Sequence, residues 1–355
     1  ECLHCDATYP ESQMFDGCPE CRTNDFVSNV VPIYDYDQLR TVVSRDRFEG
    51  RHDGMWRYRE VLPVATDNRV TLGEGGTPLV DCEELGHQFG VNDLYLKDES
   101  QNPTWSFKDR LASVAVSKAL ESGAQVVTIS STGNHGSATA AYASQAGLES
   151  VIFTKESVPE TMKTLMQVYG ANVVALETSA GRWALMEQCV EEYGWYPTGS
   201  YVSPPVGSNF YGIEGYKTIA YEICEDLGWS VPDVVVQPTA YADGLLGIWR
   251  GFTEIKRLGL VEEVPRMVSA EPFGPLKRTL ESGSDEPQTV DTGSSIAFSI
   301  GAGVSTYQGL VALRESDGMS ILTDDDELRE LQQLVGRTTG IYGEASAVAA
   351  AARAE

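Results

Sequence analysis

The stretch Asn102-Pro103-Thr104-Trp105-Ser106-Phe107-Lys108-Asp109-Arg110 joins a strand-like run, Asp93 to Lys97, to a segment with apolar residues at helical spacing. Lys108 therefore lies in the first turn of the predicted helix, where the helix dipole disfavours a cation by about 0.3–1 kcal/mol. A lysine that forms a Schiff base with a carbonyl cofactor would remove that cost. The simpler structural alternative is a lysine that pairs with Asp109 or Glu99.

A second strand, loop and helix follow. Val126 to Ser130 is predicted to be a buried strand, and the loop Ser131-Thr132-Gly133-Asn134-His135-Gly136-Ser137 leads into a helix of small residues, Ala138 to Ala146. A polar loop that contains glycine, placed between a strand and a helix N-terminus, can bind an anion through its backbone N–H groups. The same residue types also serve as ordinary turn and cap residues.

Strands and helices alternate from Leu94 onward, which predicts an α/β fold with parallel sheets covered by helices on both faces. The predicted strands are Leu94–Lys97, Val126–Ser130, Ser150–Phe153, Asn172–Leu176, Val234–Gln237 and Met267–Ala270. The predicted helices are Phe107–Leu120, Asn134–Ala146, Glu160–Val168, Ala180–Glu192, Ile213–Asp226, Gly244–Leu258, Ser305–Arg314 and Asp325–Leu334. The stretch Tyr193–Tyr211 is rich in Gly, Pro, Ser and Tyr and is expected to be a hinge between two sheets.

These motifs, in this order, resemble the fold-type II pyridoxal-phosphate-dependent enzymes, the tryptophan synthase beta-like family that includes the threonine synthases. The matching segments are Gly75–Leu79, Asn102–Thr104, Ser106–Arg110, Ser130–Gly136, Glu214–Thr218, Gly247–Phe252 and, more weakly, Gly340–Ala347. The resemblance extends from about Gly75 to the end of the chain. It implies two parallel-sheet domains, and with the N-terminal cysteines we expect a zinc ribbon in 1–28, a connector and part of the large domain in 29–92, the small domain in 93–195 and the large domain in 196–355.

The resemblance also implies roles for individual residues. Lys108 would bind pyridoxal 5'-phosphate covalently and act as the catalytic residue, and Asn134 would bind the phenolic oxygen of the cofactor. The residues expected at the substrate carboxylate are Ser131, Thr132, Gly133, Asn134 and His135. The implied reaction converts O-phospho-L-homoserine and water to L-threonine and phosphate. His135 could instead be a capping or packing residue.

The expected phosphate-binding loop departs from the family. Where relatives usually carry a run of glycines, this chain has Thr239-Ala240-Tyr241-Ala242-Asp243-Gly244. Asp243 would repel a phosphate, so we expect it to cap the following helix and leave other N–H groups for the cofactor phosphate. The alternative is a remodelled or lost cofactor site in a non-catalytic relative.

Three further departures from the family pattern concern the substrate pocket and the pyridine nitrogen of the cofactor. Trp105 and Leu111 replace glycines that are common in the family, and they either narrow the substrate pocket or fill the core. A Thr/Ser-Gly segment that contacts the pyridine nitrogen in the family would lie beyond Ala354. Another enzyme of the same fold type therefore stays possible, such as a threonine or serine ammonia-lyase or a cysteate-synthase-like β-replacement enzyme.

The N-terminal segment carries a separate motif. The pairs Cys2/Cys5 and Cys18/Cys21 have the C-x2-C spacing of paired knuckles, and four thiolates predict a closed, structural Zn2+ site. The alternatives are two disulfides, a redox-active pair and an iron centre of similar geometry. His4 lies between ligands and is expected to be a bystander.

The 355-residue chain carries a formal charge of −26, from 52 acidic and 26 basic residues. This excess argues against nucleic acid and anionic membranes as partners, and no apolar run is long enough to span a bilayer. We expect a cytoplasmic enzyme of a small amino-acid substrate, adapted to a salt-rich, halophilic cytoplasm in which the charges are screened. The sequence leaves a homodimer open. The chain begins at Glu1, not Met, so native terminal segments are expected beyond it.

Overall fold

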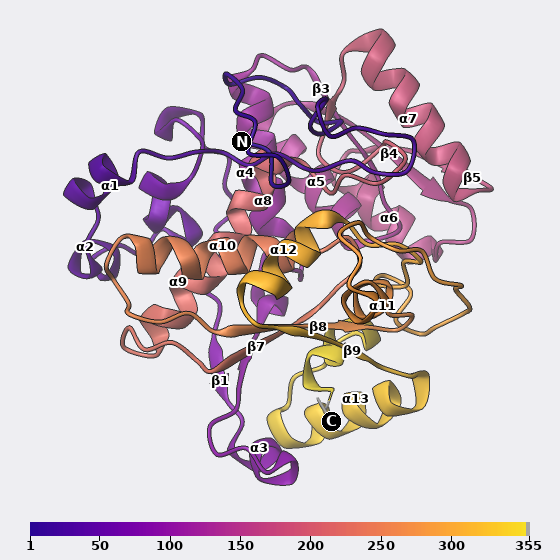
Figure 1. Cartoon of the computed structure of the whole chain (residues 1–355). Coiled ribbons are helices and arrows are strands. Elements are labelled where there is room, and N and C mark those ends of the chain that lie inside the picture. Colours follow the sequence, from indigo (N-terminus) through magenta and orange to yellow (C-terminus); the bar gives the residue numbers. More distant parts are fainter. Residues whose placement is uncertain (353–355) are drawn as a thin grey trace. The chain divides into compact units, whose positions relative to one another are not determined.

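Two parallel β-sheets organise the structure, a computed structural model that describes residues 1–352 (Figure 1). The chain divides into two compact units. Unit 1 consists of Glu1–Gly76 and Glu99–Thr218, and unit 2 consists of Thr77–Asp98 and the described residues from Ile219 onward. No helix within residues 1–352 has the length and apolar composition needed to cross a membrane.

The sheet of unit 1 has the strand order β5-β4-β3-β6, and every neighbouring pair is parallel. The strands are β3 (Val126–Ser130), β4 (Glu149–Lys155), β5 (Asn172–Leu176) and β6 (Tyr196–Pro197). The larger helices are α4 (Lys108–Glu121), α5 (Asn134–Ala146), α6 (Glu160–Val168) and α7 (Ser179–Tyr193). Ile129 and Ile152 of the sheet pack against Ala140 of α5 and Met166 of α6, which fixes the start of α5 at the end of β3.

Shorter elements complete unit 1. They are α1 (Tyr36–Val42), α2 (Arg45–Glu49), α8 (Phe210–Ile213) and the single-turn or 3-10 elements η1 (Gly54–Val61), η2 (Thr66–Asn68), η3 (Glu99–Gln101) and η4 (Glu214–Tyr216). Helix α4 packs along α5 through Ala112 and Val116, which contact Ala138 and Tyr142. The helix that begins at Lys108 is therefore anchored to the helix that begins at Asn134.

The sheet of unit 2 has the parallel order β7-β8-β9, and a separate antiparallel pair joins β1 to β2. The strands are β1 (Leu79–Asp81), β2 (Tyr95–Lys97), β7 (Val234–Pro238), β8 (Arg266–Glu271) and β9 (Met319–Leu322). The helices are α3 (Glu83–Phe89), α10 (Asp243–Arg257), α11 (Pro275–Ser282), α12 (Tyr307–Glu315), α13 (Asp325–Thr339), α14 (Ala345–Val348) and η5 (Ala349–Ala351), and α9 (Lys217–Asp226) contains the division between the units. Leu328 and Leu331 of α13 pack against Val268 and Ala270 of β8.

The α/β prediction and its parallel sheets are confirmed, and several elements match residue for residue. The predicted hinge Tyr193–Tyr211 is wrong, because it contains β6, which pairs with Val127 and Thr128 of β3 inside unit 1. The units also differ from the expected domain boundaries. Residues 29–76 and 196–218 belong to unit 1, and residues 93–98, which were expected in the small domain, belong to unit 2 together with 77–92. The expected contact segment beyond Ala354 lies outside the described residues.

Candidate active site

Helix α4 begins at Lys108, one residue after the predicted start, with Phe107 at its N-cap position, so Lys108 lies in the first turn as predicted. The Lys108 Nζ atom lies 4.4 Å from the ring centroid of Phe107 and 5.6 Å from that of Tyr216. These two rings are 5.0 Å apart, and Tyr216 is fully buried. Lys108 itself is half-buried. The faces of these two rings attract the Lys108 ammonium group electrostatically and hold its side chain at this position.

The first residue of the substrate loop expected at residues 131–135 forms hydrogen bonds within the loop. The Ser131 hydroxyl accepts the backbone N–H groups of Gly133 and Gly136, at 3.2 and 3.0 Å, and so fixes the turn into α5. Thr132, Asn134 and His135 are half-buried on this turn. The Ser131 side chain therefore stabilises this turn, in addition to any contact with a ligand.

Buried polar atoms without a hydrogen-bond partner cluster around this loop. Among residues 1–352, the Nε2 atom of His135 and the hydroxyls of Ser130 and Ser137 are buried with no partner. Folded proteins rarely leave such atoms unsatisfied, so they suit a polar ligand at this position. Burial, and then the positive charge of Lys108, hold the pKa of His135 well below its usual value. The structure thus brings Lys108 and a neutral His135 close enough to influence each other within unit 1.

The expected phosphate loop, Thr239–Gly244, lies in unit 2 between β7 and α10. Ser305 donates to the carbonyl oxygen of Ala240 at 2.7 Å, and Thr306 and Gln308 donate to that of Tyr241 at 2.6 and 2.7 Å. In a trans peptide the N–H group points opposite to the carbonyl oxygen, so the N–H groups of Tyr241 and Ala242 point away from these side chains. This arrangement suits an anion at the start of α10.

The structure corrects one detail of this loop. Ala242, not Asp243, is the N-cap residue of α10, so the prediction that Asp243 caps the helix is wrong. Asp243 is the first helical residue, and its carboxylate accepts the Gln308 side-chain amide at 2.6 Å. Ala242 adopts the left-handed conformation, with φ of 63°, a backbone geometry that favours glycine.

The sequence alone did not identify Ser305, Thr306 and Gln308 as residues of this site. In the structure all three are almost completely buried. The available signal was a polar run immediately before the helix that begins at Tyr307. All three residues fall inside a predicted helix, Ser305–Arg314, which in the structure begins at Tyr307.

Trp105 and Leu111 have different environments. Leu111 is fully buried and lies against Gly212 of α8, so it fills the core. Trp105 is 64% exposed and has a φ of 62°, a conformation that favours glycine. Two unfavourable features therefore coincide at a residue three positions before Lys108.

The four N-terminal cysteines form a cluster in which all Sγ atoms lie within 4.8 Å of one another. The Sγ atoms of Cys2 and Cys21 are 3.6 Å apart, and those of Cys5 and Cys18 are 3.8 Å apart. Four sulfurs at the Zn–S distance of about 2.3 Å stand about 3.8 Å apart in a tetrahedron. All four are free thiols, which contradicts the disulfide alternative, and the cluster fits a tetrahedral metal ion.

Polar groups surround these sulfurs. The His4 Nδ1 atom lies 3.3 Å from Cys21 Sγ, the His4 backbone N–H donates to Cys2 Sγ at 3.3 Å, and the Tyr9 hydroxyl lies 3.1 Å from Cys18 Sγ. Such contacts orient thiolate ligands and stabilise their charge. His4, expected to be a bystander, contacts a member of the cluster.

Residues 70–355 match the family model described as pyridoxal-phosphate dependent enzyme. The chain therefore belongs to the family of pyridoxal-phosphate-dependent enzymes. Within that family it is 34% identical to the threonine synthase of Methanocaldococcus jannaschii over 97% of this chain and 83% of the relative. It is 33% identical to the threonine synthase of Methanosarcina acetivorans over 99% of this chain and 85% of that protein.

Solved structures agree on the fold. A threonine deaminase isoform 2 from Solanum lycopersicum superposes with a TM-score of 0.68 at 19% identity, covering 98% of this chain and 87% of that one. A maize serine racemase gives a TM-score of 0.66 at 21% identity, over 78% of this chain and 81% of that one. Identities this low establish the shared architecture alone.

Proposed function

We propose that this protein is a threonine synthase that converts O-phospho-L-homoserine and water to L-threonine and phosphate. The observation that carries the proposal is the identity to threonine synthases over nearly the whole chain, together with Lys108 at the start of α4. The reaction breaks the bond between Cγ and the phosphate oxygen and places a water oxygen on Cβ. Pyridoxal phosphate, when bound, supplies the electron sink for these steps.

Different residues of the chain bind the cofactor and the substrate. Lys108 binds the cofactor through its Nζ atom and then moves protons at the substrate. The loop Ser131–His135 binds the substrate carboxylate with backbone N–H groups and hydroxyls, and Asn134 binds the phenolic oxygen of the cofactor. The loop Thr239–Gly244 binds the cofactor phosphate through N–H groups at the start of α10, while Gln308 holds the Asp243 carboxylate.

Several finer assignments belong to the same proposal. Cys2, Cys5, Cys18 and Cys21 hold a structural Zn2+ ion in an N-terminal ribbon, because four thiolates complete a tetrahedron and leave no open position. The substrate is a small amino acid, and the enzyme works in the cytoplasm. Size-exclusion chromatography with light scattering would decide whether it works as a homodimer.

The deciding experiment measures phosphate release from O-phospho-L-homoserine by the protein loaded with pyridoxal phosphate. We expect phosphate and threonine in equal amounts, and little 2-oxoacid from threonine or serine. Lys108→Ala should abolish the visible absorbance of the lysine-bound cofactor and lower kcat by about 10³-fold or more. Formation of 2-oxoacid without phosphate release would instead identify an ammonia-lyase.

A further inference from the structure

Hydrogen bonds attach the segment that precedes Lys108 to the first turn of α4, and we call each such set of bonds a tie. The carboxylate of Asp109 accepts the backbone N–H of Thr104 at 2.9 Å and the Thr104 hydroxyl at 2.8 Å. Asp109 is fully buried and Thr104 is 3% exposed, so solvent does not compete for these bonds. The carboxylate of Asp109 therefore links the residue directly after Lys108 to Thr104, which lies four residues before the lysine.

A second tie holds the beginning of the same segment. Arg110 donates to both carboxylate oxygens of Glu99, each at 2.7 Å. Asn102 donates to Glu99 at 2.9 Å and accepts the N–H of Gly75 at 3.0 Å. Such paired, charge-assisted bonds fix geometry as well as supplying energy. Residues 99–104 are thus attached to the first turn of α4 by the two side chains that follow Lys108.

The segment between these ties holds a strained residue. Trp105 has a φ of 62° and is 64% exposed, so no core packing around it compensates for the left-handed conformation. Its N–H donates to the carbonyl of Asn102 at 2.8 Å, and the Ser106 hydroxyl accepts the N–H of Lys108 at 3.2 Å. The ties on either side hold this conformation in place.

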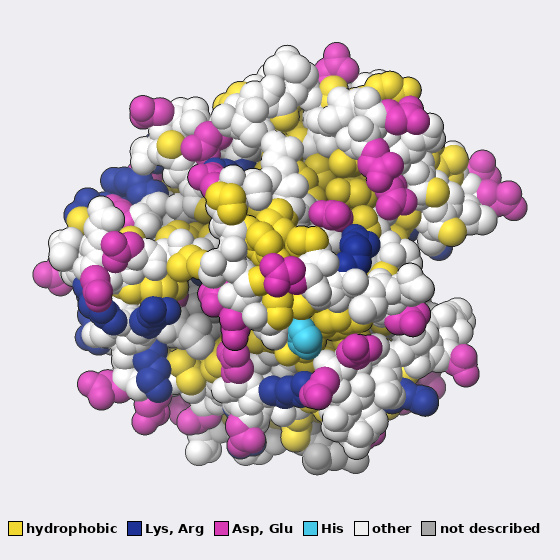
Figure 2. Space-filling model, turned by 45° about the horizontal axis from the view of Figure 1, so that its top comes forward, with side chains coloured by type: hydrophobic (Ala, Val, Ile, Leu, Met, Phe, Trp, Pro, Cys, Tyr) yellow, Lys and Arg dark blue, Asp and Glu magenta, His cyan; other side chains and the backbone are white. Residues whose placement is uncertain are grey.

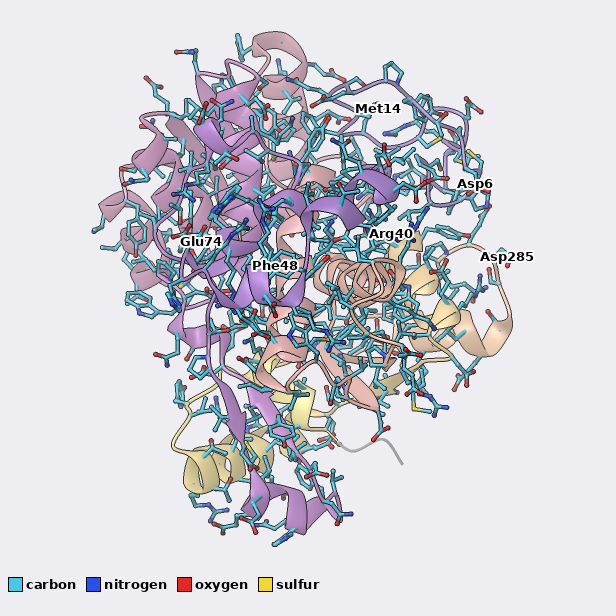
Figure 3. All side chains as sticks on the ribbon, turned by 90° about the vertical axis from the view of Figure 1, so that its left-hand side faces the viewer. Asp6, Met14, Arg40, Phe48, Glu74 and Asp285 are labelled. Carbon is cyan, nitrogen blue, oxygen red and sulfur yellow. The ribbon has the colours of Figure 1, made fainter. Side chains whose placement is uncertain are left out.

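Asp109 lies among other ionisable groups. Glu74, fully buried before β1 and labelled in Figure 3, accepts the Trp56 indole N–H at 2.8 Å and the Tyr142 hydroxyl at 2.7 Å. Burial raises the pKa of Asp109 to about 7, against the hydrogen bonds from Thr104, and the negative charge of Glu74 raises it further. Tyr142 of α5 and Tyr169 after α6 also face this carboxylate, and burial with the charge of Asp109 raises the pKa of each. Arg110 is the positively charged residue among these ionisable side chains, and its charge acts to lower the pKa of Tyr142.

We propose that Asp109 is a positioning residue for Lys108: by holding Thr104, its carboxylate fixes residues 104–107 against α4 and sets the direction in which the lysine side chain leaves the helix. The inference rests on the proposed role of Lys108 in binding the cofactor. An ionised carboxylate accepts from both Thr104 donors, whereas a protonated one turns an oxygen into a donor and loosens the tie. Activity that depends on this tie therefore falls as the pH drops through about 7.

Two variants test the tie from both ends. Asp109→Asn replaces one acceptor oxygen with a donor, and Thr104→Val removes only the hydroxyl donor. The matched control is Thr338→Val in unit 2, where the hydroxyl donates at 2.9 Å to Leu334 of its own helix. Hydrogen–deuterium exchange of the backbone amides of residues 104–108, measured without cofactor, should become about tenfold faster in both test variants and not in the control.

The loaded enzymes give the second readout. We expect both variants to keep the visible absorbance of lysine-bound cofactor. Asp109→Asn should lower kcat by about 10–100-fold and Thr104→Val by about 3–10-fold, with KM changed less than about threefold, because the reacting groups are misaligned and not removed. The acidic limb of the kcat/KM profile near pH 7 should disappear in Asp109→Asn.

The outcomes separate the two proposals. A wild-type protein that never shows the absorbance overturns the proposed function and this inference with it. Wild-type absorbance, combined with unchanged exchange, kcat and pH profile in the variants, overturns the positioning role alone. If Asp109→Asn does not fold, Thr104→Val decides, since it leaves the carboxylate in place.

Discussion

Lys108 and His135 are electrostatically linked within unit 1, because the lysine charge adds to burial in lowering the pKa of the imidazole. The neutral ring presents a buried Nε2 atom that has no partner among residues 1–352. A neutral imidazole can donate through one nitrogen and accept through the other, so this atom suits a polar substrate group in either tautomer.

Removing the lysine charge should therefore raise the pKa of His135. In cofactor-free Lys108→Met, the ring should take up its proton at a higher pH than in the wild type, and NMR of the imidazole signals would follow this. The signal of His87, exposed on α3, serves as the reference. An identical His135 titration in both proteins would show that the charge of Lys108 does not reach the ring.

Asp109 should make stability depend on pH. Its pKa is raised from 3.8 to about 7 in the folded state, so the folded protein binds this proton more tightly than the unfolded chain does. The resulting stabilisation is fully present below about pH 4 and is lost as the pH rises to about 7. The free energy of unfolding of the wild type, relative to Asp109→Asn, should fall by about 1.4 kcal/mol per pH unit across this window and level off above it. Urea unfolding at several pH values measures it, and parallel curves would contradict the shift.

Trp105→Gly should cost little stability despite the loss of a large side chain. Glycine relieves the left-handed strain of about 1–2 kcal/mol and adds a backbone entropy cost of about 0.5–1 kcal/mol, while little buried surface is lost. The matched variant is Trp56→Ala, whose side chain is 1% exposed and donates to Glu74, and which should cost about 3–5 kcal/mol. Urea unfolding compares the two. A loss above about 1 kcal/mol in Trp105→Gly would mean that the indole packs in solution.

Metal removal should unfold the N-terminal segment that carries the four cysteines and destabilise unit 1. Phe15 of this segment packs against Tyr196 with ring centroids 4.8 Å apart, and Glu11 forms an ion pair with Lys118 of α4 at 2.6 Å, so the segment is attached to the rest of unit 1. Cys18→Ser or a strong chelator should release one zinc per chain and lower Tm by about 5 °C or more. Cys189→Ser is the control, because Cys189 is a buried thiol outside the cluster. A zinc content of zero in the purified wild type would refute the assignment of zinc.

Salt should stabilise the protein. Asp and Glu side chains are scattered over the face shown in Figure 2, in keeping with the net charge of −26. Because the Debye length falls to about 3 Å at 1 M salt, KCl screens this self-repulsion. Thermal melting should show Tm rising from low salt to molar KCl. Maximal stability in low salt would contradict a halophilic adaptation.

Periodicity and turn residues predicted the helices of the α/β fold well, since α5 and α6 have the expected bounds. The strand β6 was missed because two residues carry no periodic signal, and it forms only by pairing with β3. The loops 131–135 and 239–244 begin directly after β3 and β7, where their motifs placed them in the chain. The tie between Asp109 and Thr104 could not, because its strength depends on burial by α5 and the Glu74 segment, which no local pattern encodes.

The split composition of unit 2 has a consequence for synthesis of the chain. Leu85 of α3, from the early segment 77–98, completes its packing against Val335 of α13. At about 5–20 residues per second, roughly 10–50 s pass on the ribosome between these partners. Nascent chains therefore leave the apolar side chain of Leu85 uncovered until almost the whole protein has emerged, and fragments ending near Thr218 should recruit chaperones or aggregate.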